Sequence, residues 1–98
     1  MNSKEEMLTA LRDLSITTDV LINGLAADDL DKGHEAISVL LMQGMNYFGP
    51  KSTAMQQFFP VWDAIKNHID RGDGPRAAGQ ARLWKTQLEE IISIVTNG

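Results

Sequence analysis

Between Ala78 and Val95, apolar residues recur at steps of three and four positions. The series is Ala78, Ala81, Trp84, Leu88, Ile91 and Val95, with Ile92 beside it. An α-helix completes a turn every 3.6 residues, so this spacing places the series on one face of a helix. The pattern covers only about two and a half heptads, which is short for a coiled coil. We therefore expect a helix that buries one stripe against other helices of the same domain.

The beginning of the chain shows the same periodicity. Ser3 and Glu6 have the spacing of a capping box, which predicts a helix start, and Asn23 followed by Gly24 predicts its end. The β-branched run at residues 16–18 is unfavourable for an unbroken helix. The apolar stripe of this segment comprises Met7, Leu8, Leu11, Leu14, Thr18, Leu21, Ile22 and Leu25.

A second helix is expected after Asp28 or Asp29, either of which can serve as its N-cap. Its apolar stripe includes Gly44, and a glycine at that place predicts the close approach of another helix. Gly49 and Pro50 predict where this helix ends.

A third helix is expected to begin near Pro50 or Ser52 and to run past Pro60. Proline inside a helix removes one backbone hydrogen bond and crowds the preceding turn, so we expect a kink there. A restart at Pro60 would make Phe59 the N-cap, and phenylalanine is a poor cap, which favours one kinked helix over two.

Gly72, Gly74 and Pro75 predict a turn before the last helix. Four amphipathic helices joined by short turns predict an all-α fold, a small antiparallel bundle of four helices in a single domain over residues 1–98. Three helices preceded by an irregular N-terminal segment are the alternative.

The charges are unevenly distributed along the chain, whose net charge is −4. Eight acids against three bases give residues 1–35 a net charge of −5, whereas residues 36–62 carry Lys51 alone. The basic residues Arg71, Arg76, Arg82 and Lys85 form a modest cluster near the only acid among them, Asp73. Nucleic-acid binding depends on clustered lysine and arginine, so this distribution disfavours a nucleic-acid partner without excluding one.

The chain has no cysteine, no apolar run long enough to span a membrane and no secretory leader pattern. These features predict a cytoplasmic protein that does not enter the membrane.

The sequence contains no pattern that predicts an enzyme. The segment that begins at His34 and Glu35 has Ser38 where a zinc protease would have its second histidine, and His68 is distant in sequence. The serine and threonine residues lack the neighbours that activate a nucleophile. We expect no catalytic residue, no metal, no cofactor and no small-molecule substrate.

Residues 34–59 could also form a DNA-binding helix-turn-helix, with residues 46–50 as the turn and residues 51–59 as the recognition helix. Lys51, Gln56 and Gln57 are side-chain types that contact bases or phosphates. The single positive charge of that helix weighs against this alternative.

Residues 44–62 contain five of the six aromatic residues and only one charge. Aromatic residues are enriched at the centres of protein interfaces, and adjacent residues of a helix point about 100° apart, so these side chains cannot all face one core. The sequence therefore predicts a protein-binding surface, which a second copy of the chain or a larger partner would cover. Its predicted residues are Tyr47, Phe48, Phe59 and Trp62, with a polar rim of Arg71, Arg76 and Arg82. A regulator, adaptor, inhibitor or homodimer would use such a surface; the alternative is that the same residues form only the core.

Overall fold

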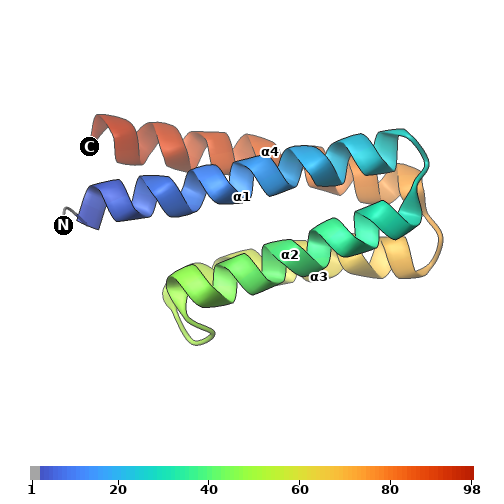
Figure 1. Cartoon of the computed structure of the whole chain (residues 1–98), viewed down its shortest axis with the longest axis horizontal. Helices are drawn as coiled ribbons and strands as arrows, with labels where there is room; N and C mark the ends of the chain where they lie inside the picture. The colour runs from blue at the N-terminus through green and yellow to red at the C-terminus, as the bar shows by residue number, and fades with distance from the viewer. Residues whose placement is uncertain (1–2) are drawn as a thin grey trace.

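The computed structural model describes residues 3–98, which form four helices in an antiparallel bundle (Figure 1). The helices are α1 (Ser3–Ala26), α2 (Leu30–Phe48), α3 (Thr53–Asp70) and α4 (Gly74–Asn97). Each helix packs against the helices before and after it, and α4 closes the bundle by packing against α1. The predicted all-α four-helix bundle is confirmed.

Short polar side chains cap the three helices that follow turns. The carboxylate of Asp29 accepts from the backbone N–H of Lys32 at 3.1 Å, and the hydroxyl of Ser52 accepts from that of Met55 at 3.1 Å. Asp73 caps α4 in the same way, with Pro75 in the first turn as expected. Gly49 and Gly72 adopt positive φ angles of 83° and 75°, which glycine tolerates without strain.

The predicted end of the first helix at Gly24 is wrong, because α1 continues to Ala26. Leu25 is buried, and the aliphatic part of the Lys32 side chain covers Gly24 so closely that an added Cβ would lie 3.2 Å from it. Packing against α2 therefore favours the helical conformation beyond the glycine.

The β-branched run in α1 does not interrupt the helix, and its Thr18 forms a polar pair inside the core. The Thr18 hydroxyl donates to the carbonyl oxygen of Leu14 at 2.7 Å. The hydroxyl oxygen of Thr18 in turn accepts a hydrogen bond of 2.9 Å from the indole N–H of Trp84 on α4. Both side chains are fully buried, and the two hydrogen bonds offset the cost of placing their polar atoms there.

The interior is one apolar cluster to which all four helices contribute. Its centre is aromatic: the ring centroids of Trp62 and Trp84 lie 5.3 Å apart at an interplanar angle of 88°, and Phe58 contacts both. Gly44 of α2 faces this layer, where an added Cβ would lie 2.6 Å from Cζ3 of Trp62. The predicted close approach at Gly44 is confirmed, and the approaching helix is α3.

The first and last helices, α1 and α4, have 24 residues each, whereas α2 has 19 and α3 has 18. At 1.5 Å per residue this makes α1 and α4 about 8 Å longer. Figure 1 shows their free ends side by side, extending beyond the α2–α3 turn. The Nζ of Lys4 donates to the carbonyl oxygen of Thr96 there, at 3.1 Å. None of the helices in residues 3–98 is long and apolar enough to cross a membrane.

Candidate protein-interaction surface

The aromatic residues of segment 44–62 divide between the core and the surface. Trp62, which the sequence predicts as a partner contact, is fully buried between α2 and α4 and presents no side-chain surface to a partner. Phe48 is partly buried and meets the edge of the Phe58 ring, with 5.9 Å between centroids. Tyr47 and Phe59 are about half exposed. The segment therefore supplies both the centre of the core and two surface residues.

Tyr47 and Phe59 lie on opposite flanks of α2: Tyr47 is on the side of α1, and Phe59 is on α3. Tyr47 faces α1, where its hydroxyl donates to the carboxylate of Asp13. This hydrogen bond raises the pKa of the Tyr47 phenol, with smaller contributions from desolvation and from the negative charge of Asp13. Phe59 lies on α3, eleven positions before Asp70, and residues at this spacing share one face of a helix. Because Asp70 contacts His34 of α2, this face of α3 is the one directed toward α2.

The three arginines do not surround the aromatic residues. Arg71 and Arg76 lie at the α3–α4 turn, at the opposite end of α3 from Tyr47 and Phe48. Arg82 lies on α4, which packs against α1 and α3. The predicted arginine rim is therefore not assembled, because the length of α3 separates Arg71 and Arg76 from the aromatic residues and Arg82 lies further along α4.

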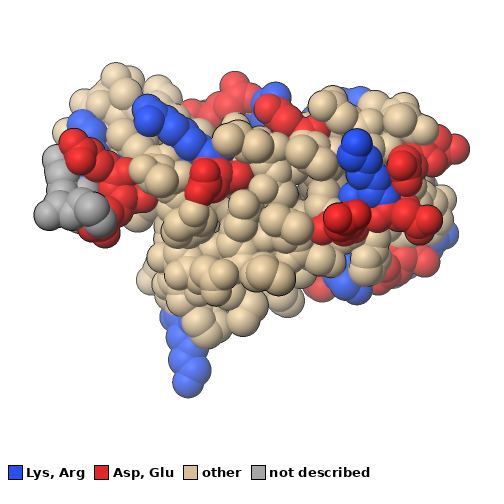
Figure 2. All heavy atoms as spheres, viewed as in Figure 1, with Lys and Arg blue, Asp and Glu red and all other residues tan. Residues whose placement is uncertain are grey.

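The surface that the structure does present is the outer face of α2 (Figure 2). Val39, Met42 and Met45 point away from the buried residues Ile37, Leu40 and Gly44 and expose 38%, 62% and 48% of their areas. From residue 36 to residue 50 the sequence contains no charged side chain. Figure 2 shows the corresponding uncharged area across the middle of the molecule, with charged side chains around it.

Neighbouring helices widen this face. On α1, Ile16 and Val20 are exposed beside Val39, and all three line a groove of about 260 Å³ that Lys32 and Glu35 border with charge. On α3, the half-exposed Phe59 lies on the side of the helix that faces α2. We call this set the α2 face; it consists of Ile16, Val20, Val39, Met42, Met45 and Phe59.

The area of the α2 face is adequate for a specific contact. If a large side chain exposes about 200 Å² when free, these six residues expose on the order of 600 Å² together. Each partner covers about 800 Å² in an interface of standard size, including its polar rim. Contiguous exposed apolar patches of this extent are often functional.

Sequence reasoning missed Ile16, Val20, Val39, Met42 and Met45. The low charge of residues 36–62 is a feature of the sequence, but the enrichment of aromatic residues at interfaces points to the aromatic side chains of this stretch and not to its aliphatic ones. Once Ile37, Leu40 and Gly44 are assigned to the interior, the helix period alone places residues 39, 42 and 45 outside.

A second groove, of about 680 Å³, lies where α1 extends beyond the end of α2. Its apolar lining comes from Met7 and Ala10 of α1 and from Tyr47 and Phe48 of α2, and its polar lining includes Glu5 and Glu6. It adjoins the α2 face at Tyr47 and differs from it in having an acidic edge.

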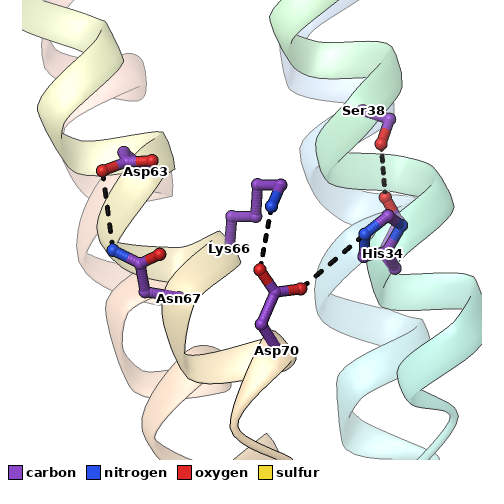
Figure 3. Close-up of polar contacts among 6 residues, drawn as sticks. All are labelled: His34, Ser38, Asp63, Lys66, Asn67 and Asp70. Carbon is purple, nitrogen blue, oxygen red and sulfur yellow. Dashed lines mark hydrogen bonds and ion pairs between the residues drawn. The ribbon is translucent and has the colours of Figure 1, made fainter.

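A small polar cluster joins α2 to α3 (Figure 3). The carboxylate of Asp70 accepts from Lys66 Nζ at 2.8 Å and lies 3.7 Å from Nε2 of His34. The hydrogen bond from Lys66, together with the positive charges of Lys66 and His34, holds the pKa of Asp70 below its usual value. All three side chains are solvent-exposed, so the cluster is a surface contact between the two helices and contributes little to stability.

No group of three or more histidine, cysteine or acidic side chains in residues 3–98 is arranged to hold a metal ion. The described part of the chain therefore offers surfaces and grooves as its candidate sites.

The geometry of the α2–α3 pair bears on the DNA-binding alternative. The two helices of a helix-turn-helix cross at about 90–120°. Here α2 and α3 lie side by side and antiparallel, as Figure 1 shows, and the buried face of α3 carries Phe58 and Trp62. This arrangement is that of a bundle hairpin.

Comparisons of the chain with models of protein families, with curated proteins and with solved structures find no match. The surface itself therefore carries the functional inference.

Proposed function

We propose that this protein acts by binding protein, through the α2 face. The observation that supports the proposal is the combination of exposed Val39, Met42 and Met45 with a helix that carries no charge over residues 36–50. Interface centres are depleted of charge and enriched in methionine and aromatic residues, and flexible methionine side chains adapt to the shape of a partner.

The residues predicted from the sequence enter this proposal selectively. Phe59 belongs to the α2 face, while Tyr47 and Phe48 line the adjoining groove. Trp62, Arg71, Arg76 and Arg82 have no part in it. The proposed role is that of a small regulator, adaptor or inhibitor without catalytic residues, located in the cytoplasm as expected from the sequence.

Site-specific crosslinking in the producing cells tests the proposal. A photoreactive amino acid replaces Met42 in one variant and Leu83 in the other; these side chains are matched in exposure, at 62% and 61%. We expect crosslinked protein adducts from position 42 and few from position 83. Absence of adducts at position 42, or equal amounts at both positions, would contradict the proposal.

A further inference from the structure

The charges at the two ends of α2 have opposite sign. Around its N-terminal end lie the acids Asp29, Asp31 and Glu35 with the base Lys32 among them, which leaves that end net negative, while Lys51 follows the C-terminal end in the turn to α3. Asp31, Glu35 and Lys51 are exposed, and the residues between Glu35 and Lys51 carry no charge. The α2 face is thus an apolar strip with a net negative end and with Lys51 beyond its other end.

Such a strip is complementary to a copy of itself turned end for end. If two α2 helices pack antiparallel about a two-fold axis at Met42, each Val39 faces the Met45 of the other copy. Asp31 and Glu35 lie eleven and seven positions before Met42 and therefore on the same side of α2, so the pairing brings them toward the turn that carries Lys51 in the other copy. One symmetric contact then pairs apolar residues at its centre and opposite charges at both ends.

We propose, resting on the proposed function of the α2 face, that its occupant is a second copy of this chain, with the two α2 helices antiparallel and Met42 at the two-fold axis. The net charge of −4 would oppose association through most other faces, whereas the α2 face brings no like charges together at its centre. The exposed area of the face agrees with the half-interface of such a dimer.

Sedimentation equilibrium over a range of micromolar concentrations, on the full chain, measures the association directly. We expect a dimer for the unmodified protein. M42E places two negative charges at the axis and should raise the dissociation constant at least a hundredfold. The matched variant L83E, which adds the same charge at an equally exposed position of α4, should dimerise like the unmodified chain. Circular dichroism and chemical denaturation verify that both variants are folded.

Charge reversal tests the antiparallel register. K51E should weaken the dimer roughly two- to tenfold, since exposed ion pairs are individually weak and the symmetry breaks two of them at once. E35K should weaken it to a similar extent, and the double variant E35K/K51E should recover most of the loss. Additive weakening in the double variant would overturn the register.

Because the chain contains no cysteine, M42C provides a single thiol for a proximity test. Residues on a two-fold axis meet their own copies, so mild oxidation should convert M42C to a disulfide-linked dimer. L83C should remain monomeric under the same treatment. Equal crosslinking of both variants would overturn the placement of the axis.

The outcomes separate this inference from the proposed function. A chain that stays monomeric at 100 µM, or a dimer that M42E leaves intact, overturns the self-association. If adducts at position 42 in cells then contain a different protein, protein binding through the α2 face stands while the second copy is excluded as its occupant.

Discussion

The outer faces of α2 and α4 expose apolar residues to a similar degree, yet only one of them is a candidate binding surface. On α4, Leu83 and Ile94 are 61% and 71% exposed, but they lie eleven positions apart, and Arg82, Glu89 and Glu90 occupy the same exposed side of the helix. On α2, Val39, Met42 and Met45 fall within seven positions with no charged residue between them. Scattered apolar residues are ordinary on protein surfaces, so the continuity of the patch is what distinguishes α2.

The inner faces of the two helices differ in the opposite sense. α4 contributes the bulk of Trp84 to the middle of the core, whereas α2 contributes Gly44, whose missing side chain leaves room for Trp62. α4 therefore combines a large inner residue with a charged outer face, whereas α2 combines a small inner residue with an apolar outer face. Substitutions on the two helices therefore should have contrasting effects on stability and on association.

The largest expected effect is that of W84A, which removes the central side chain of the α4 inner face. We expect the free energy of unfolding to fall by about 3–5 kcal/mol, because the cavity loses contacts with Trp62 and Phe58 and leaves the Thr18 hydroxyl without its donor. Urea denaturation followed by far-ultraviolet circular dichroism measures it. L83A on the outer face of the same helix should change the value by less than about 0.5 kcal/mol; comparable losses in both variants would contradict the assignment of Trp84 to the core.

Glycine substitutions compare the inner side of α2 with the surface of α4. G44A places a Cβ 2.6 Å from Cζ3 of Trp62 and 2.7 Å from Sδ of Met55, and we expect a loss of about 1–3 kcal/mol through overpacking. G79A meets no described atom within 4 Å and should stabilise the protein by about 0.5–1 kcal/mol through its better helix propensity. The same denaturation experiment measures both, and a shift of the same sign in the two variants would rule out this reading of Gly44.

The polar pair of the core gives a further test of the α4 inner face. T18V keeps the shape of the side chain but removes the oxygen that accepts from Trp84 Nε1, leaving a buried N–H unpaired. We expect a loss of about 1–2 kcal/mol. In the background of W84F, which has no N–H to satisfy, the same change should cost less, and a double-mutant cycle in urea measures the difference. Purely additive losses would show that the hydrogen bond contributes nothing.

The smallest expected effect concerns pH and the α2–α3 contact. The pKa of Asp70 is lower in the folded protein than in the unfolded chain, mainly because Lys66 donates a hydrogen bond to its carboxylate. Its contribution to stability is therefore complete above the unfolded-state pKa of about 4 and is lost as the pH falls through the folded-state pKa. D70N should flatten the acid side of the stability profile below about pH 4, and at neutral pH it should cost only the loss of one exposed ion pair. Urea midpoints at several pH values measure this, and an unchanged acid slope would argue against the depressed pKa.

The parts of the fold that depend on local sequence were predictable. Apolar spacing predicted the bundle, and Asp29, Ser52 and Pro75 predicted the helix starts, because capping and proline geometry act within one turn. The end of α1 was predicted wrongly, since the packing of Lys32 over Gly24 depends on a neighbouring helix.

The site was less predictable for a related reason. Phe59 and Trp62 both fit an apolar stripe, and the position of α2 and α4 around α3 decides that Trp62 is inside and Phe59 half outside. The arginines show the same limit, because the direction of α3 separates Arg71 and Arg76 from Tyr47 by the length of a helix. The sequence does show the uncharged stretch of α2. With Gly44 placed inside, the helix period predicts that residues 39, 42 and 45 face outward.

The nearly perpendicular contact between Trp62 and Trp84 gives the protein a built-in optical reporter. The two indoles come from α3 and α4 and are the only tryptophans in the chain, so their coupled near-ultraviolet circular dichroism reports whether these helices remain packed together. A state that keeps its helices but loses side-chain packing would lose this signal while retaining its far-ultraviolet spectrum. Changes confined to the α2 face should leave the signal intact, which allows association and core packing to be followed separately in one unlabelled sample.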